Sequence, residues 1–309
     1  MTLVSIIIPC YNVENYVAEC LDSALQQTYT NTEIICVENN STDNTFSIVK
    51  DYAARYPGKI TLLQETKQGA PAARNKGLTA AQGEWIQFLD ADDRLLPGKI
   101  ERQVEEIEKS GESFDIIISP LTRVLVSSKI VHIEIAPEVW AGLITSRAGS
   151  TCSNLYKKDI LTKINGWDET RVSSQEAWLL FALLKNNAKV KLFDKDETIV
   201  NERSSGSISK TNRSGNWERY LVFRKEIWDY LKEKGKLTPA LEAKLKGYIF
   251  DSIRMIYKEN PRQACKLFLD VVKPNFFPVP SDATSKKYIL IYRLLGFSAT
   301  EKLFSICKP

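Results

Sequence analysis

Three aspartates that follow an apolar stretch are the residues of this sequence best suited to bind a cation. The stretch ends at Leu89, and Asp90, Asp92 and Asp93 come directly after it. Closely spaced carboxylates at a buried edge are costly unless a positive partner compensates them. A hard divalent cation with bound phosphates is a suitable partner, because such ions prefer oxygen ligands. The alternative is a solvated turn in which the aspartates cap a helix.

Polar residues follow two earlier apolar runs in the same way. Residues 3–9 lead to Tyr11, and residues 33–37 lead to Asn39. Short, β-branched apolar runs are typical of strands buried in a parallel sheet. Ligands of such sheets bind beyond the carboxyl ends of the strands. We therefore expect these polar side chains to meet the three aspartates in one crevice.

The predicted strands alternate with helices, which indicates an α/β fold with a mostly parallel central sheet flanked by helices. Asn12 is predicted to cap the first helix. Residues 121–135 alternate in the manner of antiparallel strands, and a polar loop is predicted over residues 204–215, followed by helices. Strands are predicted at residues 3–9, 33–37, 60–63, 85–89, 115–118 and 190–193, and helices at residues 45–55, 99–109 and 173–187.

Charge is distributed unevenly along the 309 residues. The net charge is +4, but residues 1–209 hold 22 basic and 28 acidic residues, whereas residues 210–309 hold 20 and 10. A chain of this length suggests one large domain with an appendage. We therefore predict an α/β domain at residues 1–209 and a basic, mainly helical extension at residues 210–309.

Several classes of protein are excluded by what the sequence lacks. The six cysteines are scattered and the lone histidine, His132, lies in an alternating apolar segment, so a zinc site is not expected. No Gly-x-Gly-x-x-Gly follows the first strand and no Gly-Lys-Ser/Thr occurs, which argues against a dinucleotide-dependent oxidoreductase and a phosphate-loop nucleotidase. No apolar run approaches the roughly 20 residues of a membrane span, and no signal peptide is recognisable. We expect a cytoplasmic protein without a nucleic-acid partner.

Four segments in the first hundred residues resemble the family-2 glycosyltransferases, in the same order. They are VSIIIPCYN (residues 4–12), IICVENNSTD (34–43), GAPAARNKGL (69–78) and GEWIQFLDADD (83–93). The resemblance is looser up to about residue 209 and is not recognisable beyond it. It implies a GT-A fold, a nucleotide-sugar donor, a magnesium or manganese ion, and inversion at the anomeric carbon.

The resemblance also implies roles for individual residues. Asp92 would hold the metal that bridges the diphosphate, with support from Asp93. Asn39 stands where many family members have an aspartate that reads uracil, and an amide oxygen still accepts a hydrogen bond from the imide proton of uracil, without charge assistance. A uridine donor is therefore preferred. The donor-binding residues implied are Pro9 and Tyr11 at the base, Glu38, Asn39, Arg74 near the nucleotide, Asp90 on the ribose side, Ala91, and Arg203 at the phosphates.

Three of these residues also have structural interpretations: Tyr11 as packing at the rim, Arg74 as part of an ion pair, and Asn39 as a turn former. Arg203 and residues 207–209 resemble a family segment that closes over the diphosphate, and the small, polar residues there predict mobility without donor.

The resemblance places the catalytic base at Glu176, in an acidic motif that opens a helix. A positioned carboxylate that takes the acceptor proton contributes about 100- to 10,000-fold. Gly-Trp-Asp-Glu at residues 166–169 resembles the Gly-Phe-Asp-Glu loop of the family. The alternative is that Glu176 only completes a capping box with Ser173. Ala182 and Trp178 depart from the family pattern, which leaves a non-catalytic nucleotide-sugar-binding homologue as the rival function.

The last third of the chain combines cations with aromatic residues, as in residues 217–228 and 286–293. One interpretation is peripheral contact with the inner face of a membrane that carries a lipid-linked saccharide acceptor. The other is a solvated basic face whose aromatic residues pack on the first domain or on a second subunit, as in a homodimer. By family analogy the setting is surface polysaccharide biosynthesis, with a saccharide or lipid-linked saccharide as acceptor.

Overall fold

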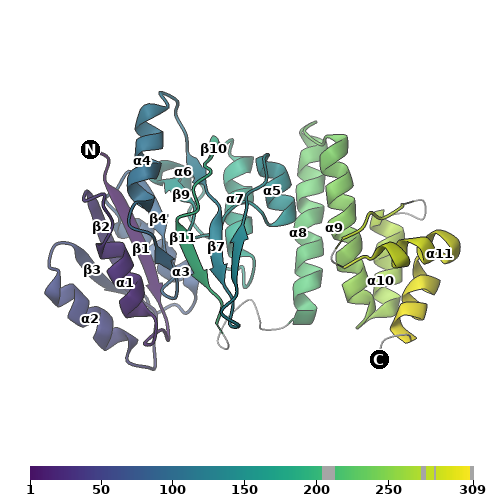
Figure 1. The fold of residues 1–309 in the computed structure, drawn as a ribbon, viewed down its shortest axis with the longest axis horizontal. Helices are drawn as coiled ribbons and strands as arrows, with labels where there is room; N and C mark the ends of the chain where they lie inside the picture. The colour runs from purple at the N-terminus through teal and green to yellow at the C-terminus, as the bar shows by residue number, and fades with distance from the viewer. Residues whose placement is uncertain (204–212, 273–275, 282, 307–309) are drawn as a thin grey trace. The chain divides into compact units, whose positions relative to one another are not determined.

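The computed structural model describes residues 1–203, 213–272, 276–281 and 283–306, coloured along the chain in Figure 1. The chain forms two compact units, Met1–Gly206 and Ser207–Pro309. The boundary expected after residue 209 and the family segment at residues 207–209 lie outside the described residues, as does most of the loop expected at residues 204–215.

A seven-stranded sheet forms the centre of the first unit, in the order β10-β6-β9-β4-β1-β2-β3. All neighbouring pairs are parallel except those that β9 makes with β4 and β6. This confirms the mostly parallel sheet predicted from the sequence. The strands are β1 Val4–Cys10, β2 Thr32–Glu38, β3 Ile60–Gln64, β4 Trp85–Phe88, β6 Ile116–Ile118, β9 Leu155–Lys157 and β10 Val190–Leu192.

The sheet is apolar on both faces because helices cover both. Ile6 and Ile8 of β1 belong to the core cluster formed with buried side chains of α1, α2 and α4. Ile7 points the opposite way, against α3, where Gly77 lies so close that an added Cβ would stand 2.4 Å from its Cγ2. The helices of this unit are α1 Val17–Leu25, α2 Thr45–Arg55, α3 Ala70–Ala80, α4 Lys99–Lys109, α5 Val139–Thr145, α6 Lys158–Lys163 and α7 Gln175–Lys185.

A second, four-stranded sheet has the order β5-β11-β7-β8. β7 and β8 form the antiparallel pair expected within residues 121–135. His132 lies on β8 with most of its side chain exposed, and its Nδ1 is 3.0 Å from Oδ2 of Asp196. The strands are β5 Arg94–Leu95, β7 Leu121–Val124, β8 Ile130–Ile133 and β11 Thr198–Asn201.

The expected helix cap at Asn12 is wrong. Helix α1 begins at Val17, its N-cap is Tyr16, and no side chain caps it. Asn12 instead adopts a left-handed backbone conformation (φ 48°), and its Oδ1 accepts a hydrogen bond of 2.8 Å from the backbone N–H of Thr42. The side chain of Asn12 therefore joins the loops after β1 and β2, because it accepts a hydrogen bond from a loop N–H instead of capping the helix.

The second unit consists of helices around an aromatic core. Phe250 lies at its centre and contacts five other rings, and the rings of Phe268 and Phe297 stack 4.4 Å apart. A helical extension was predicted, although α8 begins inside the stretch predicted as a loop. The helices are α8 Arg213–Glu233, α9 Pro239–Tyr257, α10 Pro261–Leu267, a π-helical turn Phe268–Val272, and α11 Lys286–Ile306, which is kinked at Gly296. Among the described residues, no helix has the length and apolar character needed to cross a bilayer.

Candidate active site

The carboxyl ends of β2, β1 and β4 lie side by side and bring together the polar segments that follow them. β1 pairs in parallel with β2 on one side and with β4 on the other. The backbone N–H of Asn39 donates to the carbonyl of Cys10, and that of Leu89 donates to the carbonyl of Ile7. The pairing thus continues past the strands, and the segments meet at one edge of the sheet as predicted.

Asn39 fixes the loop that precedes α3. The residue is buried, and its Nδ2 donates to the carbonyls of Glu65 (2.7 Å) and Lys67 (2.8 Å). Its Oδ1 accepts from the backbone N–H of Gly69 (2.7 Å). Glu38, also buried, accepts from the backbone N–H of Ser41 (2.5 Å). The structural interpretation of Asn39 as a turn former therefore has direct support, and contact with a base remains a prediction.

Arg74 of α3 forms a partly buried ion pair with Asp90. Its Nη2 lies 2.6 Å from Oδ1 of Asp90, and its guanidinium carbon lies 4.5 Å from the centre of the Trp167 ring. Burial opposes the positive charge, but the carboxylate of Asp90 keeps the pKa of Arg74 above its ordinary value. Nη1 also contacts Oε1 of Gln175 at 3.3 Å, which connects α3 to the first residue of α7. Asp90 and the start of α7 are therefore held by the same guanidinium.

Asp92 forms an ion pair with Arg203. Nε of Arg203 lies 2.6 Å from Oδ2 of Asp92, and its guanidinium carbon lies 4.9 Å from the centre of the Tyr16 ring. Burial, and then the charge of Asp90, raise the pKa of Asp92, whereas Arg203 lowers it. The net shift of the pKa is upward, and burial is its main cause.

Asp93 is a supporting residue. It is buried, its Oδ1 accepts from the backbone N–H of Asn201 (2.9 Å), and its Oδ2 accepts from the thiol of Cys152 (3.2 Å). Burial and the nearby charges of Asp90 and Asp92 raise its pKa well above the ordinary value. Asn201 also donates from Nδ2 to the carbonyl of Asp92 (2.6 Å), so β11 holds the turn of aspartates from one side.

The side chains at this turn fit a divalent cation. The ligand atoms of Asp90, Asp93 and Cys152 lie within 4.8 Å of one another. However, Asp93 already accepts two hydrogen bonds, and burial raises the pKa of the Cys152 thiol, which a hard cation disfavours as a ligand. Asp90 and Asp92 are partly exposed carboxylates, and each is paired with an arginine. They are the oxygen donors that suit Mg²⁺ or Mn²⁺ best.

Glu176 opens α7 and is accessible to solvent. The N-cap of this helix is Ser174, in a left-handed conformation and without a side-chain cap, so the alternative of a capping box between Ser173 and Glu176 is wrong. The protein surrounding Glu176 disfavours its charged form and raises the pKa of the carboxyl, although Arg74 opposes this shift. A raised pKa is a common property of a carboxylate that acts as a base.

Asn75 holds the Gly-Trp-Asp-Glu loop against α3. Its Oδ1 accepts from the backbone N–H of Trp167 (2.8 Å), and its Nδ2 donates to the carbonyl of Trp167 (2.9 Å) and to Oε1 of Glu169 (2.7 Å). Gly166 is needed beside it, because φ is 71° and a Cβ would stand 2.4 Å from Oδ1 of Asn75. Lys67 adds an ion pair of 2.6 Å with Glu169.

The remaining predicted donor residues differ in their exposure. Tyr11 is 47% exposed at the end of β1, so its ring is accessible to a ligand. Pro9 is half-buried and Ala91 is buried. Sequence reasoning missed Cys152 and Asn201, because both reach the aspartates from distant segments with no motif of their own. Trp167 lies within a recognised motif, although its position below Arg74 was not foreseen.

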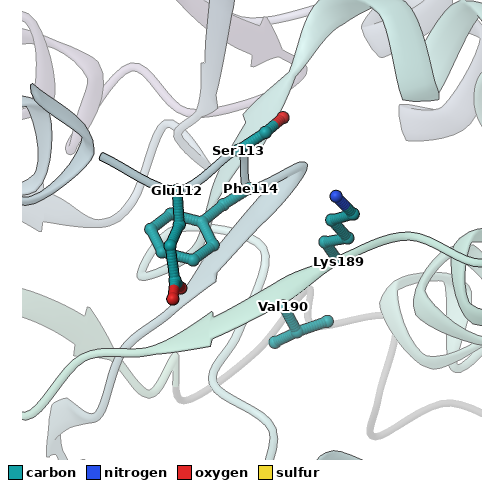
Figure 2. Close-up of a pocket in the computed structure, with 5 residues that line it drawn as sticks. All are labelled: Glu112, Ser113, Phe114, Lys189 and Val190. Carbon is teal, nitrogen blue, oxygen red and sulfur yellow. The ribbon is translucent and has the colours of Figure 1, made fainter. Parts of the chain in front are cut away.

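A pocket between the starts of β6 and β10 lies at the other edge of the sheet. It is lined by Phe114 and Val190 with their neighbours, and Figure 2 shows the Lys189 side chain on the opposite side of the opening from Glu112. These residues precede or begin their strands, whereas the aspartates follow β4. The pocket is thus separate from the crevice that the sequence predicts.

Comparison with known sequences gives related proteins over much of the chain. The family model described as "Glycosyl transferase family 2" matches residues 5–135. The minor teichoic acid biosynthesis protein GgaB of Bacillus subtilis is 29% identical over 253 residues, which cover 76% of this chain but only 27% of GgaB. Glycosyltransferase GlyG of Streptococcus pneumoniae is 28% identical over 246 residues, covering 74% of this chain and 80% of GlyG. The chain therefore spans about a quarter of GgaB and most of GlyG.

Comparison with solved structures shows the same fold. The crystal structure of Staphylococcus aureus TarS in complex with UDP-GlcNAc matches with a TM-score of 0.62 and 18% identity, over 98% of this chain and 91% of that one. The mannosyltransferase PcManGT from Pyrobaculum calidifontis, in complex with GDP-Man and Mn²⁺, matches with a TM-score of 0.57 and 17% identity, over 98% and 87%. The GT-A fold expected from the sequence is confirmed.

Proposed function

Because the chain belongs to glycosyl transferase family 2, we propose that it transfers a sugar from a nucleoside-diphosphate donor to an acceptor hydroxyl with inversion. The observation that carries this proposal is the convergence of a negative turn, two guanidinium groups and a separate carboxylate. Asp90 and Asp92 each pair with an arginine, and Glu176 lies one residue from Gln175, which contacts Arg74. In this arrangement one group of charged side chains is suited to bind the diphosphate and its cation. A different carboxylate, that of Glu176, is left to act as the base for the acceptor.

On the donor side, the side chains would bind the nucleotide and its phosphates. The exposed ring of Tyr11 is suited to pack against a base. Asp90 would accept from the ribose hydroxyls, and Arg203 would leave Asp92 to donate to phosphate oxygens. A Mg²⁺ or Mn²⁺ ion held by Asp92 supplies charge stabilisation for the leaving diphosphate when it is bound. Asp93 would keep its present hydrogen bonds and hold the turn in place.

On the acceptor side, Glu176 would accept the proton of the attacking hydroxyl on a carboxylate oxygen. The new bond forms between the acceptor oxygen and the anomeric carbon as the bond to the diphosphate oxygen breaks, on the opposite face of the sugar. One displacement of this kind inverts the anomeric configuration. Arg74, through Gln175, keeps the start of α7 close to the donor-side carboxylates.

A uridine base is our preferred donor. Oδ1 of Asn39 accepts one hydrogen bond, from Gly69, and an amide oxygen has a second lone pair. The imide N–H of uracil could therefore still donate to it. The alternative is a guanosine donor, and measuring activity with uridine and guanosine nucleotide sugars side by side decides between the two.

The assembly of a surface polysaccharide is the setting that we propose, with a saccharide or lipid-linked saccharide as acceptor. GgaB is named for teichoic acid biosynthesis, which supports this setting for a similar sequence. We further propose that the enzyme acts in the cytoplasm, with peripheral contact between its basic C-terminal region and the inner face of the membrane. A homodimer remains the alternative role for that region.

The test is a screen of nucleotide sugars with Mn²⁺ that measures release of the nucleoside diphosphate, with and without saccharide acceptors. Asp92→Asn and Glu176→Gln should each lower acceptor-dependent release by about 100-fold or more. Asp159→Asn on α6 and the exposed Glu84→Gln are matched controls that should retain it. If both site variants transfer sugar at the wild-type rate, the assigned roles are wrong. If the wild type binds donor but never releases diphosphate, the non-catalytic binding function is correct.

A further inference from the structure

Helix α11 carries leucines on the face turned away from the core of the second unit. Tyr288 and Tyr292 are buried, with 0% and 4% of their surface exposed. Leu290 and Leu294, which are one turn apart, are 63% and 79% exposed, and the neighbouring Leu295 is 53% exposed. The first half of this helix (Figure 1) therefore has two apolar sides, of which only one is covered by the unit.

Exposed cations border these leucines. Lys286 and Lys287 lie one turn before Leu290, and Arg293 lies one turn after it. The single acidic residue between Lys286 and Ile306 is Glu301, which is buried in an ion pair with Arg254. We call the three leucines with Lys286, Lys287 and Arg293 the leucine face. It combines exposed apolar surface with positive charge and has no acidic side chain from its own helix.

We propose that the leucine face docks on an anionic lipid surface. The leucines would enter the boundary between headgroups and acyl chains, and the cations would bind lipid phosphates. This inference rests on the proposed function in one respect, that a lipid-linked acceptor is found at such a surface. The excess of basic over acidic residues in residues 210–309, 20 against 10, acts in the same direction.

Charge favours a lipid surface over a second copy of the chain. In a two-fold contact each surface patch faces its own equivalent. Lys286, Lys287 and Arg293 would then face three identical cations, with no acidic partner on the helix. Like charges placed opposite each other oppose association. An anionic membrane instead supplies phosphates for the cations and apolar chains for the leucines.

Sedimentation of the full chain with lipid vesicles tests this inference. Vesicles of phosphatidylcholine alone are compared with vesicles that also contain phosphatidylglycerol, at low and high salt. We expect binding only to the anionic vesicles, weakened by salt. Leu290→Ser with Leu294→Ser should weaken it at least tenfold, and each of Lys286→Gln, Lys287→Gln and Arg293→Gln by about fivefold. The matched controls are Leu269→Ser, at a 59% exposed leucine outside the face, and Lys244→Gln.

Two further measurements separate this inference from the proposed function. Vesicle binding is measured without donor, so its result does not depend on catalysis. Diphosphate release with a soluble acceptor should be unchanged in the leucine variants, whose circular dichroism and melting temperature check that they fold. The inference is overturned if the wild type does not bind anionic vesicles, or if the face variants bind as well as the controls. A leucine pair variant that converts a dimer to a monomer, measured by light scattering, also overturns it.

Discussion

Nε of Arg203 lies 2.6 Å from Oδ2 of Asp92, so an arginine is paired with the carboxylate that is expected to hold the cation. The same guanidinium packs over the ring of Tyr16. In the absence of donor, Arg203 therefore competes with a cation for Asp92. When a diphosphate and its cation bind together, the guanidinium can exchange this carboxylate for a phosphate oxygen.

Removal of the Arg203 side chain should strengthen the binding of the cation and weaken the use of the donor. We expect Arg203→Ala to bind Mn²⁺ alone more tightly than the wild type, because the competing charge is gone. Its kcat/KM for the donor should fall about 10- to 100-fold, which corresponds to the loss of a hydrogen bond to a charged group. Calorimetric titration and initial rates measure the two effects. Weaker binding of Mn²⁺ to the variant would show that Arg203 supports the site rather than competing for it.

Glu176→Gln should lower kcat about 100- to 10,000-fold while donor affinity stays the same. The dependence of the wild-type rate on pH should also report the titration of Glu176. Because the surrounding protein raises the pKa of Glu176, the acidic limb of the rate should lie above the ordinary glutamate value of about 4.3. An acidic limb at or below that value would show that Glu176 is not the catalytic base.

The same substitution should also stabilise the fold at neutral pH. A carboxyl with a raised pKa in the folded state binds its proton more tightly there than in the unfolded chain. Its contribution to stability is therefore lost as the pH rises through the raised pKa. Gln has no charge to desolvate, so Glu176→Gln should melt at a higher temperature than the wild type at pH 7, and Glu84→Gln should not. A lower melting temperature would indicate that the charge of Glu176 is needed structurally.

Arg74→Met should destabilise the protein as well as inactivate it. It would leave Asp90 without its partner beside a second aspartate, and breaking a buried pair in this way costs about 3 to 5 kcal/mol. Because Asp90 is 34% exposed, we expect the lower end of that range. Urea unfolding measures the change, and Arg74→Met combined with Asp90→Asn should recover part of it. If the double variant loses as much stability as the two single variants together, the ion pair contributes nothing to stability.

Lys99 should make stability depend on pH. It is buried beside Gln87, and burial lowers its pKa to about 7. Between that pH and about 10.4 the unfolded chain binds more protons, so stability should rise with pH, by on the order of 4 kcal/mol. Lys99→Met should remove this slope in urea unfolding at pH 7 to 10, although Gln87 loses a partner at every pH. The exposed Lys50→Met is the control and should keep the slope.

The central strands and two of the helices can be predicted from local pattern alone. β1 and β2 are continuous apolar runs because both faces of the sheet are covered, and the predicted ends are within one residue of the observed ones. Helices α2 and α4 begin and end where predicted. The convergence of the polar strand ends also follows from the sequence, since parallel neighbours bring their carboxyl ends to one edge.

Other features depend on contacts between distant segments. β9 has three residues, and only its antiparallel partners β4 and β6 define it as a strand. Cys152 reaches Asp93 from the turn before β9, and Asn201 reaches it from β11. No local pattern indicates such contacts. The hydrogen bond between Asn12 and Thr42 is of the same kind, because it replaces a local helix cap with a contact across 30 residues.

The buried amide of Asn39 limits which residues this position can accept. Two of its hydrogen bonds are donated, to the carbonyls of Glu65 and Lys67, and a carboxylate at this position would have nothing to donate. An aspartate at this position would place a negative charge against the two carbonyl oxygens of Glu65 and Lys67. The loop before α3 would have to change first. A single substitution of Asn39 by aspartate is therefore expected to weaken this loop, unless the loop changes as well.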